Sequence, residues 1–262
     1  MKLNIVPART GLTWVKLGLK TFAGQPLAMA GLFFMYMAAA SVLGLVPIVG
    51  VVAALAIVPA ATLGLMAASA EASRGKFPMP SILISAFRAG QQRLRAMLTL
   101  GALYAAACLL ITLVAGLIFP LPAGGKEADM QTVVTSPAFQ QSMMLTLLLY
   151  LPVSVMFWHA PALVHWHGIT PAKSLFFSSV AIVRNLPAYL VYGFGWLAVF
   201  MIAGLLVTTL GSLLGGPEMI GTIMLPTALI MASMFFASLY FTFRDSFVDD
   251  NGATPESPGD AP

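Results

Sequence analysis

The chain has 262 residues, of which 59% are apolar and only 8% charged, and it carries a net charge of +4 and a single cysteine. A soluble domain carries about 25% charged residues, so these charges are too few to cover a surface exposed to water. The composition therefore excludes a water-soluble globular protein. The lone Cys108 excludes an internal disulfide and a metal site built from thiolates.

Residues 1–26 predict a cytoplasmic amphipathic segment. A helix over residues 11–22 places four apolar side chains on one stripe, Leu12, Val15, Leu19 and Phe22. Lys16 and Lys20 lie beside this stripe, whereas Trp14 falls away from it. Such a helix is expected at the membrane surface, with its lysines toward anionic headgroups. A loop helix packed against the rest of the protein is the alternative.

Long charge-free stretches follow, and a membrane-spanning helix needs roughly 20 apolar residues. They predict six spans, at 27–46, 48–70, 96–119, 143–164, 187–210 and 220–243. The Gly/Pro-containing link from Gly44 to Gly50 predicts that the first two spans are antiparallel neighbours. The expected fold class is therefore an all-α, polytopic transmembrane helical bundle occupying residues 27–244.

Residues 81–95, between the second and third spans, predict a second amphipathic helix. One face carries Leu83, Phe87, Gly90 and Leu94. The opposite face carries Arg88 and Arg95, which we expect to contact lipid headgroups. After the third span, residues 120–142 predict a short irregular connector on the other side of the membrane.

All three histidines, His159, His165 and His167, lie near the end of the fourth span. Imidazole binds zinc, copper, iron and haem, so a metal site is one hypothesis. On a helix, however, His165 and His167 point about 200° apart, and His159 shares a face with neither. Trp158 and Trp166 flank the cluster and favour an aromatic anchor at the membrane–water boundary.

Residues 170–185 predict a third amphipathic helix, because Thr170 and Pro171 form a typical helix start. Lys173 and Arg184 lie on one arc of it and are further candidates for headgroup contact. Residues 245–262 are acidic and rich in Gly, Ser and Pro, which predicts a disordered cytoplasmic tail.

The orientation follows from the basic residues. Twelve of the 13 Lys and Arg residues fall in segments on one side of the six spans, and only Lys126 falls on the other. The positive-inside rule places the twelve in the cytoplasm, so both chain ends are expected there.

Prolines suggest a parallel threefold repeat. Pro59, Pro161 and Pro226 each sit inside the second span of a hairpin, where a proline kinks a helix. Each hairpin also follows an amphipathic segment. The repeating unit would be an amphipathic helix, a straight span and a kinked span.

No known catalytic or nucleotide-binding motif occurs, and no span carries a charge in its middle. We therefore expect a non-enzymatic membrane protein without a cofactor, which organises or senses the bilayer or scaffolds partners. Its expected partners are anionic membrane lipids, and nucleic acid is not among them. A transporter or channel for a small neutral or hydrophobic solute is the alternative, since kinked helices can line a cavity.

Several segments carry a family resemblance: Trp158-x-x-Pro161-Ala-Leu-Val, His167-Gly168, Lys173-x-x-Phe176-Phe177-Ser178, Arg184-Asn185-Leu186 and Phe236-Ala-Ser-Leu-Tyr-Phe-Thr-Phe-Arg244-Asp245. Together they resemble the BPSS-named family of six-span proteobacterial inner-membrane proteins, over about residues 10–247. The resemblance implies a multi-pass protein of the bacterial inner membrane. The family has no established activity, so no functional residue is carried over from it.

Overall fold

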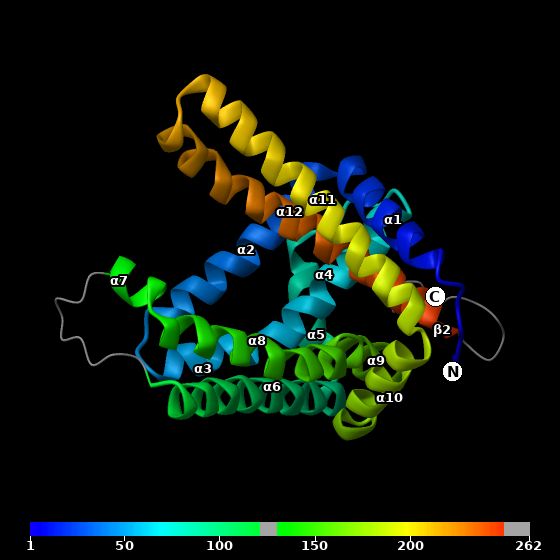
Figure 1. Ribbon diagram of the computed structural model, residues 1–262. Helices are drawn as coiled ribbons and strands as arrows, with labels where there is room; N and C mark the ends of the chain where they lie inside the picture. Colours follow the sequence, from blue (N-terminus) through cyan, green and yellow to red (C-terminus); the bar gives the residue numbers. More distant parts are fainter. Residues whose placement is uncertain (121–129, 249–262) are drawn as a thin grey trace.

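The computed structural model describes residues 1–120 and 130–248, which are almost entirely helical (Figure 1). In chain order the helical elements are α1 (Thr10–Gly24), α2 (Pro26–Gly44), α3 (Val49–Ala56), α4 (Val58–Ser73), the 3-10 helix η1 (Pro80–Ile84), α5 (Ser85–Arg88), α6 (Gln91–Ile118), α7 (Met130–Thr135), α8 (Pro137–Phe157), α9 (Ala160–His167), α10 (Pro171–Arg184), α11 (Leu186–Leu214) and α12 (Pro217–Ser246). Two short strands, β1 (Lys2–Leu3) and β2 (Phe247–Val248), pair antiparallel and join the two ends of the described chain.

Six helical segments are long and apolar enough to cross a membrane. They are Pro26–Gly44, Val49–Ser73, Gln91–Ile118, Pro137–His167, Leu186–Leu214 and Pro217–Ser246. Each overlaps one predicted span, so the all-α, six-span fold class is confirmed. The side of the membrane on which each connection lies, and the threefold repeat, stay predictions.

The three prolines of the predicted repeat do not occupy equivalent positions in their helices. Pro59 and Pro161 are each the second residue of a new helix, α4 and α9, directly after a break in the span. Proline is tolerated there because the first turn of a helix needs no N–H donor. Pro226 lies inside α12, which continues past it. The second span is therefore interrupted in the first two hairpins and continuous in the third.

The second and third amphipathic elements each pack on the hairpin that precedes them in the chain. The segment η1–α5 packs on α4, and α10 packs on α8 and α9. Helix α1 has no preceding hairpin and packs instead on the last one, α11–α12. The chain thus closes on itself, and the β1–β2 pairing lies at this closure (Figure 1).

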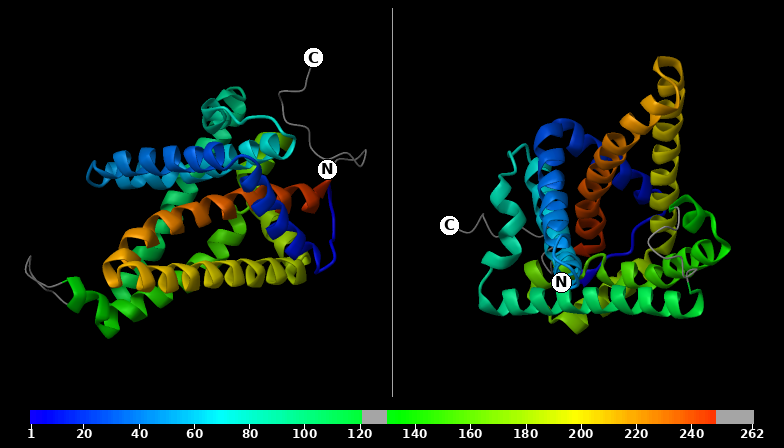
Figure 2. Two further views of the ribbon diagram at one scale, coloured as in Figure 1. Left: turned by 90° about the horizontal axis from the view of Figure 1, so that it is seen from above. Right: turned by 90° about the vertical axis from the view of Figure 1, so that its left-hand side faces the viewer.

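The core lies where α4, α9 and the C-terminal half of α12 meet. Their fully buried side chains include Leu63 on α4, Leu163 on α9 and Phe243 on α12, and Trp14 of α1 joins the same cluster. The far ends of the hairpins splay apart, with the α11–α12 turn well separated from α6 and α8 (Figures 1 and 2). Apolar side chains on the splayed part are exposed, such as Leu205 and Leu213, which suits contact with lipid.

Three predicted boundaries differ from the structure. The single helix predicted over 81–95 is wrong: the chain forms η1 and α5, turns at Gly90 with φ +91°, and begins α6 at Gln91. Helix α8 already begins at Pro137, inside the predicted connector 120–142. At the C-terminal end, α12 includes Asp245 and is followed by β2. The first residues of the predicted disordered tail 245–262 are therefore ordered. The rest of that tail lies outside the described residues.

Candidate functional site

Helices α1, α5 and α10 all adjoin one end of the spanning segments. At this end α4 contacts α9, α12 and α1, so the ends of these segments lie together. We call this part of the molecule the basic end. It carries Arg93 near the start of α6, Arg184 at the end of α10 and Arg244 near the end of α12. The polar side chains inside the molecule gather here.

A buried polar network links three helices at the basic end. The Tyr189 hydroxyl of α11 lies 3.0 Å from Nε2 of His159, which precedes α9 and is fully buried. The same nitrogen lies 3.3 Å from the Thr242 hydroxyl of α12. Thr242 also accepts a hydrogen bond from Trp158 Nε1 at 3.2 Å and donates to the Leu239 carbonyl at 2.8 Å. These contacts hold α9, α11 and α12 together.

The Ser178 hydroxyl bridges two backbone groups at the break between α8 and α9. In an unbroken helix, the N–H of His159 would donate to the carbonyl of Val155, four residues earlier. Here the Ser178 hydroxyl of α10 accepts from the His159 N–H at 3.0 Å and donates to the Val155 carbonyl at 2.8 Å. One side chain thus replaces the lost helical bond and fixes α10 to this hairpin.

Trp14 and Asp245 tie α1 to α12. The Trp14 indole is fully buried, and its Nε1 donates to Asp245 Oδ2 at 2.9 Å. The other carboxylate oxygen pairs with Arg244 Nε at 2.8 Å. A carboxylate held by an indole and a guanidinium has most of its hydrogen-bonding capacity satisfied.

The side chain of Asn185 hydrogen-bonds to the backbone of the N-terminal segment. Its side-chain oxygen accepts from the Val6 N–H at 2.8 Å, and its side-chain nitrogen donates to the Asn4 carbonyl at 3.0 Å. Asn4 in turn donates to the backbone carbonyl of Asp245 at 2.9 Å. Sequence reasoning gave no role to Asn185 or Ser178, although both lie in segments that carry the family resemblance. The sequence did offer one indication of such a role: each is a polar residue next to apolar ones in these segments.

The three histidines go to different surroundings. His159 contacts Tyr189, Thr242 and the ring of Phe247, whereas the ring of His167 lies tilted against Phe243, with centroids 5.9 Å apart. His165 faces a pocket on the other side of α9. Among residues 1–120 and 130–248, no three His, Cys, Asp or Glu side chains come together in a group suited to a metal ion. The structure thus gives His159, His165 and His167 no shared metal site among the described residues.

The two tryptophans of the histidine cluster pack inside the protein. The Trp158 ring meets Tyr189, Tyr192 and Phe235 edge-on, and the Trp166 ring lies tilted against Phe243, with centroids 5.0 Å apart. Both indoles are half-buried. They therefore serve the packing of the basic end in addition to any role as membrane anchors.

The residues predicted to contact lipid headgroups are all exposed, and they occupy four helices. They are Lys16 and Lys20 on α1, Arg88 on α5, Arg95 on α6, and Lys173 and Arg184 on α10. All belong to the basic end. The structure thus distributes them along one end of the molecule and does not form a single cluster from them.

The apolar faces of α1 and α10 differ in how far they are covered. Val15 and Phe22 of α1 are buried against the protein, as is Trp14, so α1 fits the alternative of a packed loop helix. Helix α10 buries Ile182 but leaves Phe176 63% and Val183 66% exposed. Helix α10 therefore presents large apolar side chains together with basic ones at the surface. Leu12 of α1, 45% exposed, and Phe87 of α5, 40% exposed, do so to a smaller extent.

A pocket of about 450 Å³ opens at the basic end between α4, η1–α5, α6 and α9. Its charged and polar lining residues are Glu71, Ser81, Ser85, Arg88, Arg93 and His165, and Trp166 adds an aromatic wall. Ser85 Oγ and His165 Nδ1 are buried atoms without a hydrogen-bonding partner within the described part of the chain. The structure records no ion pair between Glu71 and either arginine in the same part.

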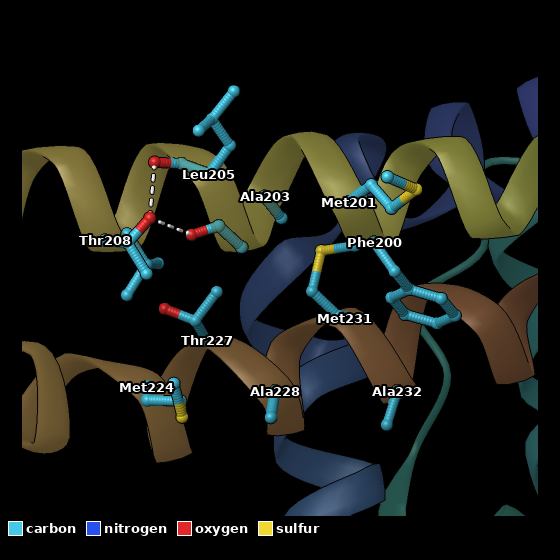
Figure 3. A pocket seen from close by; sticks show the side chains of 12 residues that line it. Phe200, Met201, Ala203, Leu205, Thr208, Met224, Thr227, Ala228, Met231 and Ala232 are labelled. Atoms are coloured by element: carbon cyan, nitrogen blue, oxygen red, sulfur yellow. Dashed lines mark hydrogen bonds between the residues drawn. The ribbon is translucent and has the colours of Figure 1, made fainter.

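A second pocket, of about 610 Å³, lies between α11 and α12 near the middle of both spans (Figure 3). Its lining is apolar apart from Thr208 and Thr227, which face each other from the two helices (Figure 3). Each hydroxyl donates to a carbonyl of its own helix, Thr208 to Gly204 and Leu205 and Thr227 to Ile223. The pocket therefore suits an apolar occupant.

Comparison with known proteins identifies a relative. A probable inner membrane protein of Burkholderia thailandensis is 34% identical to this chain over 268 residues, covering 98% of each protein. The chain belongs to this family of inner-membrane proteins. The family resemblance expected from the sequence is confirmed. No family model matches the chain, and no solved structure matches it.

Membership of the family settles where the protein resides. It is a multi-pass protein of the bacterial inner membrane, as its six apolar segments require. The exposed apolar side chains of the splayed hairpins consequently face lipid. The relative's name specifies no activity, so the functional argument rests on the basic end and on the two pockets.

Proposed function

We propose that this inner-membrane protein is non-enzymatic and that it binds phospholipid headgroups at its basic end, to organise or sense the bilayer. The observation that carries the proposal is that all six predicted headgroup residues are exposed at one end of the molecule. Each basic residue near an anionic membrane surface contributes about 1 kcal/mol of attraction. The exposed Phe176 and Val183 of α10 add apolar contact with the lipid boundary.

The proposal is tested with a variant in which Lys16, Lys20, Lys173 and Arg184 are all changed to Gln. The midpoint of thermal unfolding is measured in neutral detergent micelles with increasing amounts of phosphatidylglycerol. Anionic lipid should raise the midpoint of the natural protein, and 0.5 M salt should weaken the effect because it screens exposed charges. The fourfold variant should lose most of the shift.

The matched control is Glu218→Gln, which changes one exposed charge at the first turn of α12, away from the basic end. It should respond to phosphatidylglycerol like the natural protein. An equal response of the fourfold variant and the natural protein would contradict headgroup binding by these residues.

A second candidate function is a transporter or channel for a small hydrophobic solute, and the mid-span pocket between α11 and α12 favours it. Ala228 of α12 lines this pocket, so under this alternative Ala228→Phe would narrow it. Binding of dansylamide to the protein in nanodiscs, measured by its fluorescence, should then fall relative to the natural protein. Unchanged binding would remove the support that the pocket gives to this candidate.

A further inference from the structure

The pocket at the basic end contains charged groups of both signs, whereas attraction to an anionic membrane surface needs basic groups alone. Two guanidinium groups, of Arg88 and Arg93, line the same cavity as the carboxylate of Glu71. No ion pair joins Glu71 to either arginine within residues 1–120 and 130–248, so both signs of charge are available to an occupant. The occupant should therefore carry a negative and a positive group of its own.

A buried histidine supports a ligand site independently of the charges. His165 is only 4% exposed, yet its Nδ1 has no hydrogen-bonding partner in the described part of the protein. Ser85 of the same pocket is half-buried, and its buried hydroxyl oxygen also has no hydrogen-bonding partner in that part of the chain. Because buried polar atoms are almost always hydrogen-bonded in folded proteins, these two atoms have hydrogen-bonding capacity left for a polar partner from outside the chain.

The pocket also lies at the right level of the molecule. Glu71 is near the end of α4, Arg93 near the start of α6 and His165 near the end of α9. These are ends of three spanning segments, and phospholipid headgroups occupy the level at which spanning helices end. Basic pockets between spanning helices are typical headgroup sites.

We propose that the pocket binds the headgroup of phosphatidylethanolamine, with Arg88 and Arg93 on the phosphate and Glu71 on the ammonium group. Arginine matches phosphate oxygens in geometry and charge, and a carboxylate accepts hydrogen bonds only, as an ammonium group requires. The headgroup of phosphatidylglycerol would offer Glu71 hydroxyls in place of a cation. It would leave the carboxylate uncompensated.

This inference rests on the proposed lipid-binding function but uses residues that the fourfold variant leaves intact. A loss of the anionic-lipid response and a loss of the phosphatidylethanolamine site are therefore separate results. The pocket residues act on one bound lipid, whereas the exposed lysines and Arg184 act on the membrane surface.

The test is native mass spectrometry of the full chain in detergent, titrated with phosphatidylethanolamine or phosphatidylglycerol. The natural protein should bind one phosphatidylethanolamine in preference to phosphatidylglycerol. Arg93→Gln should weaken phosphatidylethanolamine binding by about tenfold or more, the expected effect of losing a hydrogen bond between charged groups. Glu71→Gln should remove the preference between the two lipids, because the amide no longer favours a cation.

Arg9→Gln and Glu218→Gln are the controls, because both residues are exposed and neither lines the pocket. They should leave the preference unchanged. Arg88→Gln is a second phosphate variant in case Arg93→Gln fails to fold, which is checked by its thermal unfolding without added lipid. A Glu71→Gln protein that keeps the full preference for phosphatidylethanolamine would overturn the proposal.

Soluble phosphoethanolamine separates a lipid from a free metabolite with the same chemistry. We expect it to bind far more weakly than the lipid, because the acyl chains add contact with exposed apolar side chains at the pocket, such as Met79. Binding of phosphoethanolamine without binding of the lipid would overturn the assignment to a membrane lipid.

Discussion

At the scale of single residues, Thr242 is the point at which the buried network of the basic end converges. Its hydroxyl accepts from Trp158, contacts His159 and donates to its own helix. Thr242→Val removes these contacts and leaves the Trp158 indole N–H without its acceptor, whereas His159 Nε2 keeps the Tyr189 hydroxyl. We expect the free energy of unfolding, measured in mixed micelles, to fall by about 1–3 kcal/mol.

Thr208→Val is the matched control, because the Thr208 hydroxyl is on a lipid-facing helix and donates only to carbonyls of that helix. This change should alter the free energy of unfolding by less than about 0.5 kcal/mol. Equal effects at the two threonines would show that the network contributes nothing beyond local helix stability.

Ile48 stores backbone strain in the turn between α2 and α3. It is the only non-glycine residue with positive φ in the described ranges, at φ 62° and ψ −67°. The Val49 N–H donates to the Pro47 carbonyl at 2.7 Å, which closes a γ-turn that disfavours β-branched residues. Ile48→Gly should raise the free energy of unfolding by about 0.5–1 kcal/mol, since the side chain is 81% exposed and little packing is lost.

Thermal unfolding in detergent measures this gain. Val46→Gly provides the comparison, because Val46 is an exposed β-branched residue of the same turn and its φ is negative. There the glycine should destabilise. A stabilising effect at both positions would point to a general tolerance of the turn for glycine.

At the scale of elements, the docking of α1 on α12 depends on Gly18. A Cβ added at this position would collide with Ser238, including its Cα at 2.9 Å. Gly18→Ala should therefore lower the free energy of unfolding by about 1–3 kcal/mol, although alanine favours the helix itself. Gly193→Ala in α11, where an added Cβ meets open space, should be neutral or stabilising. The free energy of unfolding of both variants is measured in mixed micelles. A loss of stability in Gly18→Ala alone would show that close packing, and not helix propensity, requires the glycine.

The amphipathic elements show how far periodicity predicts structure. The pattern over 81–95 fits one helix only if Gly90 counts as part of its apolar face, whereas the chain uses Gly90 to turn at positive φ. Trp14 lies off the predicted stripe of α1 and is nevertheless fully buried. Its partner Asp245 is 231 residues away, so no local pattern contains the information. Local periodicity gives the existence of these helices, and distant contacts determine which face is buried.

At the scale of the whole molecule, the six spans follow from the sequence because solvation by lipid is a property of local composition. The closure of the chain, in which α1 packs on α11–α12 and β1 pairs with β2, could not be predicted. The same holds for the two pockets. Arg88 was a predicted headgroup residue, but Glu71, Arg93 and His165 join it only through the packing of α4, α6 and α9.

The orientation of the bundle is the prediction on which the headgroup arguments depend. Twelve of the 13 basic residues fall on one side, so reporter fusions at residues 75 and 175 should be cytoplasmic, and those at 130 and 216 should be periplasmic. Alkaline phosphatase and a fluorescent protein fused at each point report opposite compartments and control each other. The β1–β2 pairing requires both ends of the described chain on one side, and a fusion after Val248 should therefore match residue 75. If residues 130 and 175 reported the same compartment, the basic end would not be a single membrane face, and neither lipid site could form as argued.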